Sequence, residues 1–95
     1  MKLTDERIAE LVDEIIFDLS GTKTPTIDVV MRFYESALSD SIIYSNPEKQ
    51  FVLESIIMGG TLEDAFLGMS DEEANLRSKI LVSFLKAFGI TLTVD

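Results

Sequence analysis

The side chains that could do chemistry in this chain are mainly carboxylates, which number 17 against 8 lysines and arginines. The sequence contains no cysteine and no histidine. Their absence excludes disulfides, thiol chemistry, most zinc sites and histidine-based acid–base catalysis. Paired carboxylates can act as general acid and base only where a cleft desolvates one of them. The acids fall on the expected outer faces of helices, so we expect no catalytic residue, no metal site and no cofactor.

Three further patterns resemble chemical motifs, but each lacks an essential part. The acidic run at 71–73 suits the positive end of a helix dipole better than a metal ion. The stretch Gly59-Gly60-Thr61 could offer amides to a phosphate, but it lacks the lysine of a phosphate loop and the acids at 63–64 would repel an anion. Lys79 and Ser83 are four residues apart, yet a Ser–Lys pair needs a buried, deprotonated lysine and this one lies on a polar face. We therefore expect a protein that is not an enzyme.

The strongest fold signal is the stretch 70–88, which predicts a helix with one broad apolar half at about 100° per residue. Ser70 and Glu73 form a capping-box pattern at its start, and Gly89 can take the left-handed conformation that ends a helix. So wide an apolar arc predicts a central helix that contacts several others. The apolar half consists of Leu76, Ile80, Leu81, Phe84, Leu85, Ala87 and Phe88.

A second amphipathic helix is predicted from Thr4 or Asp5 to Leu19, with acids on the face opposite its apolar side. This acidic face is either a solvated outer surface or a surface that binds a basic partner. Phe17 falls among the acids, where it is either an interface anchor or an ordinary exposed apolar residue. The candidate partner-binding residues are Glu6, Glu10, Asp13, Glu14, Phe17 and Asp18.

The remaining segments predict more helices and an extended end. A helix over 25–38 is expected to bend or break near residue 39, and a helix from 47 to about 58 should end at Gly59-Gly60. The β-branched residues of 52–58 leave a strand there as an alternative. A short helix precedes residue 70, and the tail 90–94 alternates like a strand. We predict a single domain over 1–95, an all-α bundle of four to five helices with a short extended C-terminal arm.

Self-association is a further expectation. The helix at 47–58 is apolar on nearly every side, and the tail has no partner strand. A domain of 95 residues has little interior in which to cover both, so we expect a homodimer, the commonest symmetric arrangement. The candidate contacts are Phe51, Ile56, Ile57, Leu92 and Val94.

The net charge and the absence of long apolar runs predict the kind of partner and the location of the protein. A net charge of −9 should repel free nucleic acid. A helix-turn-helix unit would place recognition near residues 38–50, where Lys49 is the only cation. No leader pattern or apolar run of about 18 residues is visible, so we expect no membrane span and a cytoplasmic location.

We therefore expect a non-enzymatic regulator, inhibitor or adaptor that presents an acidic helical face to a protein partner with a basic surface. Phages and mobile elements use proteins of this kind to occupy a basic groove on a larger target. Two alternatives stay open: a helix-turn-helix DNA-binding regulator, and an oligomeric structural or assembly subunit.

Overall fold

A computed structural model describes residues 2–21, 43–61 and 68–89, together with the single positions 26, 28, 31, 35 and 66. Within these residues the chain forms three α-helices and no strand. The helices are α1 (Asp5–Ser20), α3 (Pro47–Thr61) and α4 (Asp71–Ala87).

The predicted all-α class is confirmed for the described residues. The predicted helix over 25–38, the short helix before residue 70 and the extended tail 90–94 fall mostly or wholly outside them. A count of four to five helices and a C-terminal arm therefore stay predictions. Among the described helices, none is long and apolar enough to cross a membrane.

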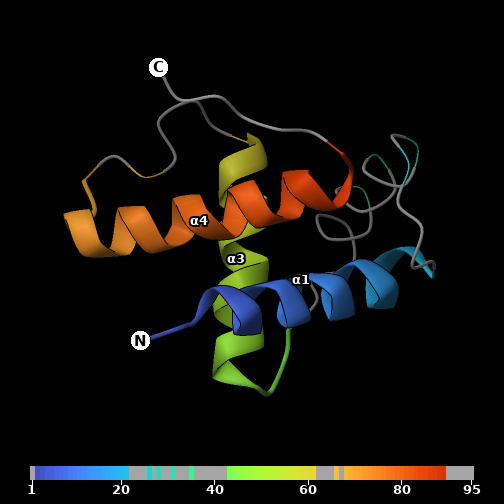
Figure 1. The fold of residues 1–95 in the computed structure, drawn as a ribbon, viewed down its shortest axis with the longest axis horizontal. Helices are drawn as coiled ribbons and strands as arrows, with labels where there is room; N and C mark the ends of the chain where they lie inside the picture. The colour runs from blue at the N-terminus through green and yellow to red at the C-terminus, as the bar shows by residue number, and fades with distance from the viewer. Residues whose placement is uncertain are drawn as a thin grey trace.

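Helices α1 and α4 lie side by side and run in the same direction, and α3 crosses behind both (Figure 1). Each of the three helices contacts the other two. This packing buries Val52, Leu53 and Ile56 of α3 almost completely, so a single chain covers much of the helix that is apolar on nearly every side. The core consists of Ile8, Leu11, Val12, Ile15, Ile16, Val52, Leu53, Ile56, Ile80 and Phe84.

The ends of α1 and α4 form as their sequences predict. The Thr4 hydroxyl accepts a hydrogen bond from the Arg7 amide at 3.1 Å, and the Ser70 hydroxyl accepts one from the Glu73 amide at 3.2 Å. Each bond satisfies an amide that the first helical turn leaves open. Gly89 adopts the expected left-handed conformation, with φ of 76°. Only half of the predicted capping box is present, because the Glu73 carboxylate binds Arg77 instead of reaching back.

Asn46 caps the start of helix α3. The Asn46 side chain accepts hydrogen bonds from the backbone amides of Glu48 and Lys49, at 2.9 and 3.2 Å. Pro47 is the first helical residue, where its missing N–H has no cost.

The prediction that Gly59-Gly60 ends this helix was wrong, because α3 continues through both glycines to Thr61. Leu81 of α4 packs directly on Gly59: a Cβ atom there would lie 2.7 Å from Cδ2 of Leu81, so a larger residue would require that side chain to shift. The strand alternative for 52–58 is excluded as well, since the whole segment is helical.

Arg77 is a buried cation that the sequence reasoning missed. Only 7% of it is exposed, and it donates to Glu73 Oε1 through Nε and Nη2, at 3.2 and 3.1 Å. Its Nη1 donates to Ser55 Oγ on α3 at 3.1 Å, and its guanidinium lies 4.2 Å from the centre of the Phe51 ring. These bonds pair the buried charge, which would otherwise be costly, and they join α4 to α3.

Candidate protein-binding site

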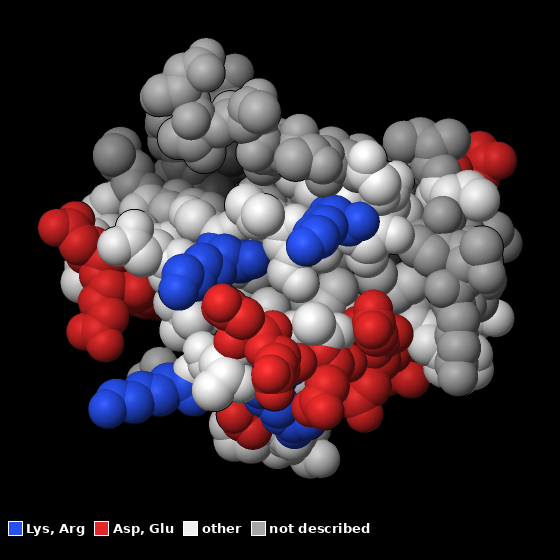
Figure 2. Space-filling view, viewed as in Figure 1, with Lys and Arg blue, Asp and Glu red and all other residues white. Residues whose placement is uncertain are grey.

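The outer surface of α1 carries the acidic residues that the sequence singled out. All five of these acids and Phe17 are exposed. We call the following set the α1 acidic face: Glu6, Glu10, Asp13, Glu14 and Phe17. Figure 2 shows the acids as a red band along α1. The only basic residue of α1 is Arg7, which bonds to Glu10 at 3.1 Å and lies 3.7 Å from Glu48 of α3. Three of the four acids on this face, Glu6, Asp13 and Glu14, form no ion pair with any described residue.

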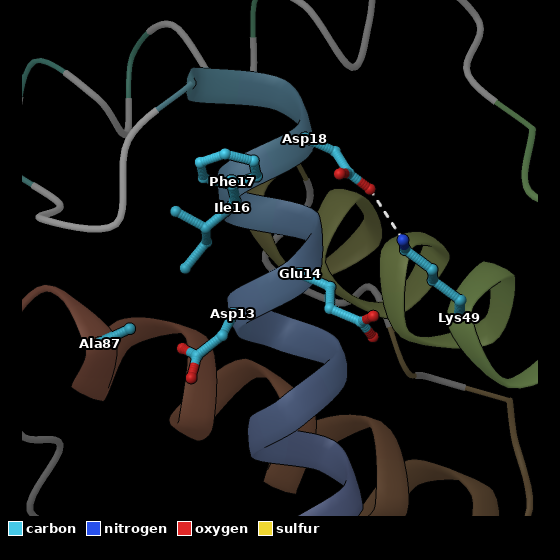
Figure 3. A pocket seen from close by; sticks show the side chains of 7 residues that line it. All are labelled: Asp13, Glu14, Ile16, Phe17, Asp18, Lys49 and Ala87. Atoms are coloured by element: carbon cyan, nitrogen blue, oxygen red, sulfur yellow. Dashed lines mark hydrogen bonds and ion pairs between the residues drawn. The ribbon is translucent and has the colours of Figure 1, made fainter.

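Phe17 lies in a hollow at the C-terminal end of this face. Its side chain is 47% exposed, and the hollow has a volume of about 620 Å³. Figure 3 shows Asp13 leaving α1 on the side of α4 and Glu14 leaving it on the side of α3. An aromatic side chain with charged residues around it resembles the anchor-and-rim arrangement of interface hot spots. The hollow is lined by Asp13, Glu14, Ile16, Phe17, Asp18, Lys49 and Ala87.

Asp18 behaves differently from the other acids predicted to bind a partner. Its carboxylate turns toward α3, where Oδ2 accepts a hydrogen bond from Lys49 Nζ at 2.7 Å and one from the Tyr44 hydroxyl at 3.2 Å (Figure 3). The Lys49 ammonium also lies 4.5 Å from the centre of the Tyr44 ring. A paired carboxylate attracts a basic partner less strongly, so Asp18 serves the fold more than the acidic face.

This cluster changes the acidity of Tyr44. Burial, the charge of Asp18 and the hydrogen bond to Asp18 together raise the pKa of Tyr44 to about 12, and Glu14 adds to the effect. The neutral phenol is therefore favoured in the folded state. Below the ordinary pKa near 10 the stabilisation is fully present, and it is lost as the pH rises from about 10 to about 12.

We expect the Tyr34→Phe variant, in which Tyr44 is the remaining tyrosine, to titrate near pH 12. A stopped-flow pH jump with tyrosinate absorbance, read before any unfolding, measures this pKa. Adding Asp18→Asn should lower the pKa only part of the way toward 10, because burial is the largest cause and remains. A pKa near 10 in both proteins would contradict the structure.

The predicted self-association residues lie partly inside the fold. Ile56 is fully buried in the core and has no surface to offer a second chain, while Phe51 and Ile57 are half-buried against that core. Leu92 and Val94 lie outside the described residues. The structure therefore gives Phe51, Ile56 and Ile57 a role within one chain, and self-association stays a prediction.

Two other observations concern metal binding and DNA binding. In the part of the chain that the structure describes, no group of three or more acidic side chains is placed to hold a metal ion. Lys49, the cation on which the DNA-binding alternative depended, is engaged by Asp18 and Tyr44.

The comparisons with known proteins give no relative. No family model, no curated protein and no solved structure matches this chain.

Proposed function

We propose that this protein is a non-enzymatic interaction protein, a regulator, inhibitor or adaptor that binds a basic surface on a larger protein through the α1 acidic face. The observation that carries the proposal is Phe17, a large aromatic side chain that is 47% exposed at a hollow. Beside it lie Asp13 and Glu14, which form no ion pair with any described residue. The acids supply long-range attraction to a cationic surface, and the aromatic ring supplies apolar area to bury on contact.

The fold leaves the charges on the outer side of α1 available for recognition. The packed side of α1 holds five core residues, and the acids lie exposed on the other side. Exposed charges contribute little to folding free energy, so these acids can bind a partner at little cost to stability.

The test is a comparison of three proteins as baits in a lysate of the source organism. The first is the wild type. The second carries Glu6→Gln, Glu10→Gln and Glu14→Gln, which neutralise the acidic face without touching the core. The matched control carries three neutralised acids on α3 and α4: Glu54→Gln, Asp71→Asn and Glu72→Gln. All of these side chains are exposed, and each triple variant changes the net charge by the same amount.

We expect one stoichiometric basic protein to be recovered by the wild type and the control, and lost by the α1 variant. Loss in both variants would mean that overall charge, and not this face, drives binding. Equal recovery by all three baits, or recovery of DNA alone, would contradict the proposal.

A further inference from the structure

The surface between α1 and α4 that faces away from α3 has a charge pattern that the proposed function does not use. A shallow groove of about 900 Å³ runs between the two helices. Its floor includes Ile8 and Val12, and its walls include Ala9 of α1 and Val82 of α4. Ala9 is exposed, and Val82 is 43% exposed. We call this surface the α1–α4 groove.

Each wall of the groove carries an apolar residue between two like charges. The α1 wall presents Asp5, Ala9 and Asp13, and the α4 wall presents Lys79, Val82 and Lys86. All six side chains are exposed. Figure 2 shows the blue side chains over α4 next to the red band over α1.

The charges on the two walls have matching spacing. At 1.5 Å of rise per residue, Asp5 and Asp13 are about 12 Å apart along α1, and Lys79 and Lys86 are about 10 Å apart along α4. The two helices also run in the same direction (Figure 1). An acidic row and a basic row of nearly equal length therefore lie next to each other with the same polarity.

Within one chain these rows are poorly paired. Lys79 Nζ and Asp5 Oδ1 are 4.0 Å apart, and their side chains are 66% and 88% exposed, so this contact contributes little. Lys86 and Asp13 form no ion pair with any described residue.

We propose that a second copy of this chain docks on the α1–α4 groove, related by a two-fold axis that runs along the groove. Rotation about that axis places α4 of one copy on α1 of the other. Because the axis is parallel to the helices, each residue keeps its height along the helix direction. Lys79 then meets the partner's Asp5, and Lys86 meets the partner's Asp13. Val82 meets the partner's Ala9 between the two charge pairs, and symmetry repeats every contact.

The charge pattern selects this pairing over the other two-fold arrangement. An axis across the helices would place lysines on lysines and aspartates on aspartates, and the repulsion between like charges disfavours that arrangement. A purely basic partner is disfavoured in the groove as well, since its cations would be repelled by Lys79 and Lys86. A second copy carries both rows in the order that the groove requires.

The dimer proposal and the proposed function can be tested separately, because they depend on different residues. Glu10, Glu14 and Phe17 do not line the groove, and Asp13 is the residue that the two surfaces share. Neutralising Glu6, Glu10 and Glu14 therefore leaves all four groove charges in place.

The test is charge reversal followed by sedimentation velocity across the micromolar range. One variant carries Lys79→Glu and Lys86→Glu, and the other carries Asp5→Lys and Asp13→Lys. The measurements use physiological ionic strength, because two chains of charge −9 repel each other at low salt. We expect the wild type to dimerise and each variant alone to lose at least about tenfold in dimer affinity.

Three further measurements test whether the two rows of charges face each other in the dimer. An equimolar mixture of the two variants should form a heterodimer, because acidic walls then meet basic walls throughout. The variant with all four reversals keeps the net charge of −9 and should recover the wild-type affinity. Val82→Asp, at an exposed position, should disrupt the dimer and leave the helical circular dichroism unchanged.

The proposal is overturned by a wild type that sediments as a monomer across that range. It is equally overturned by a dimer that survives both charge reversals, which would place the interface elsewhere. Failure of the fourfold variant to recover dimerisation would show that the rows do not face each other.

Discussion

Replacing Phe84 with alanine should lower the free energy of unfolding by about 3–5 kcal/mol, the largest effect we expect from a single substitution. Phe84 is fully buried in α4, and its ring packs edge-to-face on Phe88 with ring centroids 4.9 Å apart. Alanine would forfeit the transfer free energy of the ring and leave a cavity at the meeting point of the helices. This loss is a large part of the roughly 5–15 kcal/mol that stabilises a typical domain.

Chemical denaturation followed by circular dichroism measures the loss, and Phe17→Ala is the matched control. Phe17 is the same residue type on α1, but 47% of it is exposed, so its removal should change stability by less than about 1 kcal/mol. If the two substitutions cost the same, Phe84 would not be the core residue that the structure shows.

The second large effect is expected for Glu73→Ala, at about 2 kcal/mol. Glu73 is the carboxylate that pairs with buried Arg77. Among the described residues, its removal leaves that guanidinium with Ser55, the Met58 sulfur and the Phe51 ring. A buried charge that loses its charged partner pays most of its desolvation cost. The Glu73 side chain is 41% exposed, so water can reach part of the site, and we expect less than for a fully buried pair.

Arg77→Met should lower the free energy of unfolding less than Glu73→Ala does. If the loss of the ion pair were all that mattered, the two substitutions would have equal effects. Methionine fills similar space, the Glu73 carboxylate can turn to solvent, and Ser55 still donates to the Phe51 carbonyl at 2.8 Å. In the Arg77→Met background, Glu73→Ala should have almost no effect. Equal costs for both single substitutions, with no coupling in the double-mutant cycle, would contradict this assignment.

Local signals in the sequence predict α1 and α4 well. Thr4 and Ser70 cap their helices, Gly89 follows the end of α4, and the apolar periodicity places the buried residues on one side. The exposure of the acids and of Phe17 on α1 follows from the same periodicity. These features depend on residues within a few positions of one another, which is why the sequence alone reveals them.

Features that depend on distant contacts were missed. Gly59 lies inside α3 with Leu81 of α4 packed on it, although glycine is unfavourable within a helix. Asp18 leaves the acidic face because Lys49 and Tyr44 are placed beside it by α3.

Arg77 and the α1–α4 groove illustrate the same limit. Arg77 sits in the apolar arc of α4, where Glu73 of the same helix pairs its charge. Its further bond, to Ser55 of α3, joins residues 22 positions apart in the sequence. The matched rows of the groove appear only once α1 and α4 are known to lie side by side in the same direction (Figure 1).

The rate of association with the captured basic partner tests the role of the α1 acidic face most directly. Rates should be measured at low and high ionic strength for the wild type, the Glu6→Gln/Glu10→Gln/Glu14→Gln variant, and the control with neutralised acids on α3 and α4. We predict that the wild type and the control associate fast at low salt and slow steeply as salt rises, because charge steers the encounter. The α1 variant should associate slowly with little salt dependence. Identical rates and identical salt dependence for all three proteins would contradict the claim that this face binds the partner.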